Sequence, residues 1–138
     1  GWKRALGAAA DRLTPRLTLS NGIDPRLLAR DPGVGEGYLR DPWVHDRLSA
    51  RLYGEWMRAA HEVLERAPDL RTPYLLLLSP EDPIIDPAAA EEFERATPAD
   101  HVVRRYPDRR HEPLNDFGRE QVYADLLAWL ESGATVAA

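Results

Sequence analysis

The stretch that decides the fold runs from Pro73 to His111 and reads PYLLLLSPEDPIIDPAAAEEFERATPADHVVRRYPDRRH. It opens on an unbroken apolar run over residues 74–78, with Pro73 before the run and Ser79-Pro80 after it. A run this short between two prolines favours a β-strand over a helix. Because both faces of the strand would be apolar, we expect it to be covered on both sides, as in a parallel sheet between helices.

A helix and a second strand follow. Asp86-Pro87 is typical of an N-cap residue followed by the first helical residue, and it predicts a helix that continues through Ala96. Residues 101–106, HVVRRY, predict a second strand. Strand, helix and strand at this spacing indicate a βαβ unit with two parallel strands.

Two side chains with useful chemistry lie just beyond the C-terminal ends of these strands. Asp82 comes four residues after Leu78, and His111 comes five residues after Tyr106. In open parallel sheets, ligands bind outside the carboxyl ends of the strands. We therefore expect Asp82 and His111 to share a hydrogen bond, in which the Asp fixes the tautomer of the His and stabilises its charged form.

These motifs resemble the C-terminal part of an α/β-hydrolase. The segments LLLLSPEDPIIDP and RRYPDRRHEPLND, followed by a terminal amphipathic helix, are most similar to the monoacylglycerol lipase and lysophospholipase group, also described as the serine-aminopeptidase-like hydrolases. The resemblance places the triad Asp at Asp82 and the triad His at His111. Ser79 and Asp108 stand where that group has glycines, and Glu81 falls one residue off the position of the Asp.

The resemblance implies an α/β fold in which a helical cap over residues 1–70 precedes a βαβα part over residues 71–138. It also implies a carboxylic-ester hydrolase that acts on monoacylglycerols, lysophospholipids or similar acyl esters and needs no cofactor. Asp82 would orient His111, and His111 would act as general base and then as general acid. The same fold hosts peptidases, dehalogenases and C–C bond hydrolases, and a non-catalytic helical binding module is the alternative from another class.

The nucleophile of such a triad is not found in this sequence. It would lie in a G-x-S-x-G elbow, and none of the serines has that frame: Ser20, Ser49, Ser79 and Ser132. We therefore expect the chain to be part of a longer protein whose N-terminal segment carries the nucleophile. Without a nucleophile or an oxyanion hole, the chain alone is expected to be inactive.

The part before residue 70 is expected to be mainly helical. Apolar spacing and Asp-Pro caps predict a helix over residues 2–13, an extended segment over 17–22, a short helix over 24–30, a loop over 31–37 and a long helix over 43–67. The large side chains near the long helix either pack on a core or line an acyl pocket: Trp43, Tyr53, Trp56 and Met57. Residues 118–131 predict a last helix, whose start Asn115 and Asp116 would cap.

Composition argues against several classes of function. At 138 residues with 43% hydrophobic content, the sequence suffices for one domain or part of one. A net charge of −5 with interspersed Arg residues argues against nucleic acid as a partner, and no apolar run reaches the roughly 18 residues of a transmembrane helix. The absence of cysteine fits a cytoplasmic location. No metal site is expected, because neither His45 nor His61 has a second ligand at a useful spacing.

Overall fold

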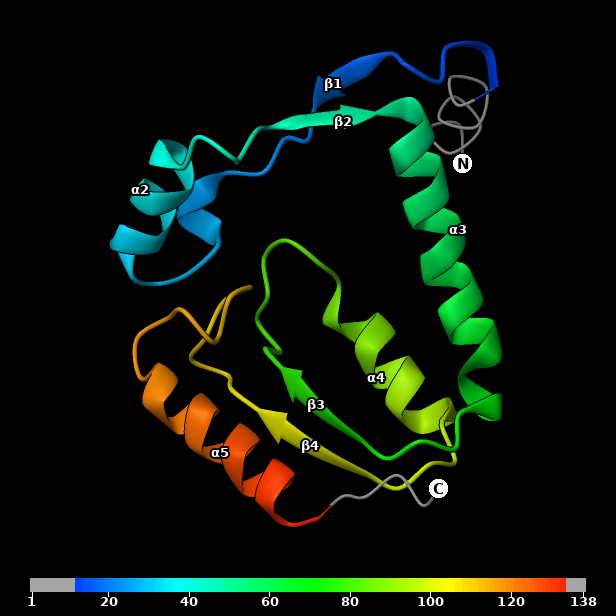
Figure 1. Cartoon of the computed structure of the whole chain (residues 1–138), viewed down its shortest axis with the longest axis vertical. Helices are drawn as coiled ribbons and strands as arrows, with labels where there is room; N and C mark the ends of the chain where they lie inside the picture. The colour runs from blue at the N-terminus through cyan, green and yellow to red at the C-terminus, as the bar shows by residue number, and fades with distance from the viewer. Residues whose placement is uncertain (1–11, 134–138) are drawn as a thin grey trace.

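The computed structural model describes residues 12–133, which form two parts that lie side by side (Figure 1). The N-terminal part contains β1 (Thr18–Ser20), the 3-10 helix η1 (Pro25–Leu27), α2 (Pro32–Arg40), β2 (Arg47–Ser49), α3 (Ala50–Arg66) and the 3-10 helix η2 (Ala67–Asp69). The C-terminal part contains β3 (Tyr74–Leu78), α4 (Pro87–Ala96), β4 (His101–Arg105) and α5 (Arg119–Glu131).

The C-terminal part is built on a parallel pair of strands. β3 and β4 are in register from Tyr74 opposite His101 to Leu78 opposite Arg105. The pairing continues one step further, where the N–H of Tyr106 donates to the carbonyl of Leu78 at 2.9 Å. The two strands therefore end side by side, and both following loops leave the same edge of the sheet. The predicted βαβ unit is confirmed.

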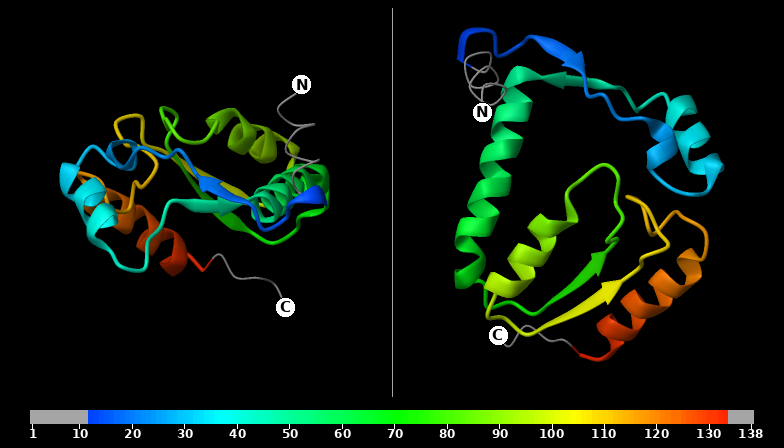
Figure 2. Two further views of the ribbon diagram at one scale, coloured as in Figure 1. Left: turned by 90° about the horizontal axis from the view of Figure 1, so that it is seen from above. Right: turned by 180° about the vertical axis from the view of Figure 1, so that it is seen from behind.

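Two helices lie on opposite sides of this strand pair, α4 on one side and α5 on the other (Figures 1 and 2). Val122 of α5 is completely buried, and Leu78 and Tyr106 at the strand ends are also buried. The Tyr106 hydroxyl donates to the carboxylate of Asp125 at 2.7 Å and so joins the end of β4 to α5. A strand pair with a helix on each side is the arrangement that the leucine run predicts, although residues 74–77 of β3 are only half-buried.

The start of α4 agrees with the sequence, and the start of α5 does not. Asp86 accepts a hydrogen bond from the N–H of Ala88 at 3.0 Å, and Pro87 occupies the first helical position. At α5 the N-cap residue is Gly118, with φ of +71° and no side-chain cap. The predicted capping by Asn115 and Asp116 is wrong, because both side chains are bonded elsewhere.

In the N-terminal part, β1 and β2 form a short antiparallel ribbon, with Thr18 opposite Ser49 and Ser20 opposite Arg47. The ribbon joins η1 and α2 at one end to α3 at the other (Figure 1). The predicted extended segment is confirmed in β1, whereas β2 has no counterpart among the predictions. The predicted helix over residues 2–13 lies almost wholly outside the described residues.

The predicted loop over residues 31–37 is wrong, because most of it belongs to α2. Asp31 caps this helix by accepting from the N–H of Gly33 at 2.8 Å, and Pro32 is the first helical residue. Gly35 is buried against η1, where a Cβ would lie 2.7 Å from the carbonyl oxygen of Pro25. Gly35 therefore marks a close approach of two backbones and not a loop.

The predicted start of the long helix is also wrong. α3 begins at Ala50, after Ser49 accepts from the N–H of Leu52 at 3.1 Å. The carboxylate of Asp41 does accept from the N–H of Trp43 at 2.8 Å, but this bond closes only a local turn. Pairing of residues 47–49 with β1 takes the place of the expected first helical turns.

Candidate active site

Asp82 lies in a tight turn directly after β3. Its N–H donates to the carbonyl of Ser79 at 3.1 Å. Its Oδ1 accepts from the N–H groups of Ile84 at 2.7 Å and Ile85 at 3.1 Å. These bonds fix the orientation of the carboxylate, so that Oδ2 is directed at His111.

The structure brings the two predicted residues together. Nδ1 of His111 lies 2.8 Å from Oδ2 of Asp82, with the Asp side chain 6% exposed and the His side chain 32% exposed. Because an ionised carboxylate can only accept, the hydrogen of this bond belongs to Nδ1. Nε2 of the neutral ring is then an acceptor, and no residue in the described range bonds to it. The arrangement leaves the second ring nitrogen of a partly exposed side chain able to take up a proton.

Electrostatics keep Asp82 ionised. Burial by itself raises the pKa of the Asp82 carboxyl, but the hydrogen bonds from His111 and from the N–H groups of Ile84 and Ile85 together lower the pKa below its usual value. A carboxylate that stays charged stabilises the imidazolium that forms when the His takes up a proton. The pair therefore has the geometry and the charge of an oriented general base.

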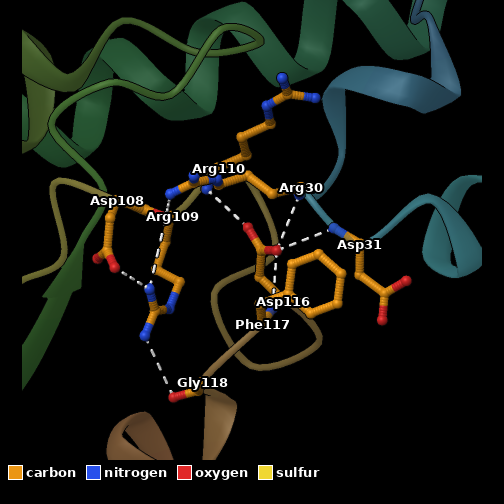
Figure 3. A network of polar contacts seen from close by, with 8 residues as sticks. All are labelled: Arg30, Asp31, Asp108, Arg109, Arg110, Asp116, Phe117 and Gly118. Carbon is orange, nitrogen blue, oxygen red and sulfur yellow. Dashed lines mark hydrogen bonds and ion pairs between the residues drawn. The ribbon is translucent and has the colours of Figure 1, made fainter.

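The backbone on both sides of His111 is held by long-range hydrogen bonds. The N–H of Arg110 donates to Asp116 at 3.2 Å, and the N–H of Glu112 donates to the carbonyl of Leu28 at 2.8 Å. The buried position of Asp116, which is only 1% exposed, is not predicted by the sequence. Its neighbours in the close-up come from both parts of the chain (Figure 3). The signal that the sequence offers is a carboxylate five residues after His111, and the same position also fits a helix cap.

Ser79 and Asp108, which replace two glycines of the resembling group, do not require a glycine-like backbone. Within residues 12–133, every residue with positive φ is a glycine, namely Gly22, Gly118 and Gly133. Both loops thus reach their observed shape with ordinary backbone angles at these two positions.

Two of the four candidate substrate-binding residues line a groove, and the other two do not. Tyr53 and Met57 line an apolar groove between α3 and α4. Trp43 is 91% exposed and Trp56 is 54% exposed, and neither lines this groove. Asp82 and His111 are not among the residues that line this groove either. A role in substrate binding stays a prediction for all four.

Within the described range, no group of three or more His, Asp or Glu residues is placed to hold a metal ion. His45 accepts from the N–H of Arg47 at 3.1 Å, and His61 pairs with Glu65 at 3.2 Å. None of the helices between residues 12 and 133 combines the length and the apolar character needed to cross a membrane.

Known proteins resemble the chain in sequence. The model of the family described as serine aminopeptidase, S33, matches residues 1–117. An uncharacterized abhydrolase domain-containing protein of Dictyostelium discoideum is 29% identical over 133 residues, which are 95% of this chain and 14% of that protein. The chain is therefore similar to a small portion of this much longer relative.

Solved lipase structures resemble it in fold. The crystal structure of Paleococcus ferrophilus monoacylglycerol lipase is 31% identical, with a TM-score of 0.82 over 96% of this chain and 52% of that one. A soluble variant of monoglyceride lipase from Saccharomyces cerevisiae, in complex with a substrate analog, is 21% identical, with a TM-score of 0.81 over 96% of this chain and 49% of that one. At that identity the likeness to the yeast protein concerns the fold alone. The chain spans about half the length of these two lipases.

These findings confirm the resemblance and the fold class that the sequence predicts. The chain belongs to the serine aminopeptidase S33 family of α/β-hydrolases, and it forms a monoacylglycerol-lipase-like part of that fold.

Proposed function

We propose that this chain supplies the Asp and the His of a Ser-Asp-His triad in a carboxylic-ester hydrolase of the monoacylglycerol lipase or lysophospholipase type. The observation that carries the proposal is the 2.8 Å contact between His111 Nδ1 and Asp82 Oδ2 at the ends of two adjacent parallel strands. In this mechanism, Nε2 of His111 takes the proton of the attacking hydroxyl and later gives it to the leaving alcohol. Asp82 holds the ring and stabilises its charge.

The attacking hydroxyl would come from a G-x-S-x-G elbow in a segment outside this sequence. Ser79 is the serine closest to the pair in the sequence, but its Oγ is buried and has no hydrogen-bond partner among the described residues. It is therefore not paired with His111 as a nucleophile would be. The proposal accordingly needs the upstream segment both for the Ser and for the oxyanion hole.

Residues 1–70 would act as a cap that selects the substrate. The lipase relatives support an acyl substrate, and one of them was solved with a substrate analog. Replacing Trp56 with Ala is expected to change acyl-chain preference or raise KM, with little effect on turnover of a short activated ester. An equal loss on every substrate would point to misfolding instead.

A peptidase is the second candidate, because the family description names a serine aminopeptidase. Both activities use the same triad and differ in the leaving group. Side-by-side assays on monoacylglycerol, lysophospholipid and an aminoacyl p-nitroanilide separate them. Preference for the anilide would replace the lipase proposal.

The direct test uses the complete protein and p-nitrophenyl esters. Based on other triad hydrolases, we expect His111→Ala to lower kcat by about 10³- to 10⁶-fold and Asp82→Asn by about 10⁴-fold. His45→Ala, at an exposed His in the N-terminal part, is the matched control and should leave kcat unchanged. Equal activity of all three variants would overturn the triad assignment. An Asp in place of the elbow Ser would favour a dehalogenase, and the lack of any elbow would favour a binding module.

The isolated chain provides a further test. We expect no hydrolysis above background from residues 1–138 alone, because two members of a triad lack the hydroxyl and the converging amides. Robust turnover by the chain alone, abolished by His111→Ala, would show that the nucleophile lies within this sequence.

A further inference from the structure

Asp116 is a buried carboxylate that accepts hydrogen bonds from backbone N–H groups. Its Oδ1 accepts from Arg30 at 2.8 Å, from Asp31 at 3.1 Å and from Phe117 at 2.8 Å, and its Oδ2 accepts from Arg110 at 3.2 Å. Figure 3 shows these bonds converging on the carboxylate from both parts of the chain. A residue that is 1% exposed and bonded in this way is held firmly by its surroundings.

The Oδ2 bond acts on the residue directly before His111. The N–H of Glu112, on the other side of His111, donates to the carbonyl of Leu28 at 2.8 Å. The backbone at His111 is thereby held on both sides, and the ring can keep the bond of Nδ1 to Asp82. If either of these two hydrogen bonds were lost, the loop could move by a fraction of an ångström, which is enough to weaken a catalytic contact.

Two of the three Oδ1 bonds act on the segment that leads into α2. Arg30 directly precedes Asp31, the N-cap residue of α2, and both of their N–H groups point to Asp116. The guanidinium group of Arg110 supports the same junction, since it donates to the carbonyl of Ala29 at 3.2 Å. The guanidinium of Arg30 does so from the other side, with a bond to the carbonyl of Asp108 at 2.8 Å. One carboxylate thus fixes both the loop that carries His111 and the segment that leads into α2.

We propose that Asp116 is a positioning residue for His111, and that it makes the geometry of the Asp82–His111 pair depend on how the 28–31 segment is attached. This inference rests on the proposed function only where activity is measured. The ionised state suits the role, because an ionised carboxylate offers acceptors on both oxygens and no donor. Burial alone would raise the pKa of Asp116, but the four N–H donors outweigh it and hold the pKa below its usual value.

The substitution Asp116→Asn tests the proposal with almost no change of shape. The amide oxygen can keep the three bonds of Oδ1, whereas the NH2 group then faces the N–H of Arg110, donor against donor. In the opposite orientation of the amide, its NH2 group would face three N–H groups instead of one. The first orientation is therefore favoured. The variant therefore breaks the single bond that lies next to His111.

The experiment compares the complete wild-type protein, Asp116→Asn and the control Glu94→Gln. Glu94 is also a mostly buried carboxylate of the C-terminal part, with a side chain 20% exposed, but it pairs with Arg105, away from this network. Two readouts are followed below the unfolding temperature. They are the downfield proton NMR signal of His111 Nδ1–H, and the separate values of kcat and KM on a short ester.

We expect Asp116→Asn to broaden or shift the Nδ1–H signal and to lower kcat by about 10- to 100-fold with KM nearly unchanged. Glu94→Gln should leave both readouts as in the wild type. An unchanged Nδ1–H signal and unchanged kcat in Asp116→Asn, even with a lowered melting temperature, would show that Asp116 only stabilises the fold. The NMR signal is informative even if the protein hydrolyses no ester, so failure of the hydrolase proposal can be told apart from failure of this one.

Amide hydrogen exchange of the wild-type protein tests, without any variant, whether the Asp116 carboxylate holds both segments. The N–H groups of Arg30, Asp31 and Arg110 end on one carboxylate, so they should be protected to the same degree and become exposed together. Rapid exchange at Arg110 beside slow exchange at Arg30 and Asp31 would overturn the proposal, even if Asp116→Asn fails to fold.

Discussion

The C-terminal part and the N-terminal part rest on different kinds of contact. In the C-terminal part, residues 71–133, a parallel strand pair lies between α4 and α5, and Val122 is completely buried. In the N-terminal part, residues 12–70, neither β1 nor the 17-residue α3 has a buried residue. Leu28 and Ala29 are buried there, close to the backbone around His111.

This difference indicates which interactions stabilise each part. The C-terminal part contributes buried apolar surface, which is the dominant stabilising term in folding. The N-terminal part buries only the side chains of Leu28, Ala29 and Ala67, and is otherwise held by a two-stranded ribbon, helix caps and its attachment to the loop around His111. Contacts of these kinds are each worth about 1 kcal/mol. We therefore expect substitutions in the two parts to change the free energy of unfolding by different amounts.

The largest difference is expected between two equal truncations. Val122→Ala should lower the free energy of unfolding by about 2–3 kcal/mol, because it leaves a cavity where a completely buried side chain was packed. Val63→Ala, at a half-exposed residue of α3, should leave the free energy of unfolding within about 0.5 kcal/mol of the wild-type value. Urea unfolding of the complete protein measures both. An equal loss at Val63 would show that another segment packs on α3, and the contrast between the two parts would then disappear.

A pair of glycines tests how closely α2 is packed. Gly35→Ala should destabilise the protein by about 1–2 kcal/mol, because the new Cβ would press on the backbone of Pro25. Gly37→Ala, in the same helix with open space around it, should stabilise the protein by about 0.5–1 kcal/mol. Thermal unfolding of the two variants gives the comparison. If both substitutions were stabilising, α2 and η1 would not be in close contact in solution.

The C-terminal part could be predicted because its signals are local. Pro73 and Ser79-Pro80 bound the leucine run, and the observed strand has the predicted limits. The Asp86-Pro87 cap sets the start of α4 through the side chain of one residue and the backbone of the next two. Parallel pairing then follows from the length of the crossover. None of these steps depends on a partner far away in the sequence.

The N-terminal part could not be predicted in the same way, since distant partners decide its structure. Residues 47–49 form a strand only because residues 18–20 lie beside them, so the long helix starts later than its apolar spacing suggests. Gly35 favours a loop by local rules, but the contact with η1 requires a residue without a Cβ. Tertiary contact overrides local propensity in both cases.

The candidate site shows the same division. Asp82 and His111 could be paired from the sequence, because both follow parallel strands that end at one edge. The hydrogen bonds of Asp116 could not be predicted, because its partner Arg30 lies 86 residues away. Local rules predict that this carboxylate caps α5, but the N-cap residue of α5 is Gly118.

The smallest expected effect concerns the start of α3. Ser49→Ala should lower the free energy of unfolding by about 1 kcal/mol, because it removes the acceptor for the N–H of Leu52. Asp41→Ala should leave the helix content unchanged, since the bond from Asp41 to Trp43 closes only a turn. Circular dichroism and urea unfolding follow the two variants.

The order of these two effects decides where the helix begins in solution. If Asp41→Ala lowered the helix content more than Ser49→Ala, α3 would start near residue 43, and residues 47–49 could not pair with β1. The N-terminal part would then lack its ribbon, and α3 would follow α2 with no strand between them. The structure predicts the reverse order, because an N-cap stabilises a helix only at the residue where the helix starts.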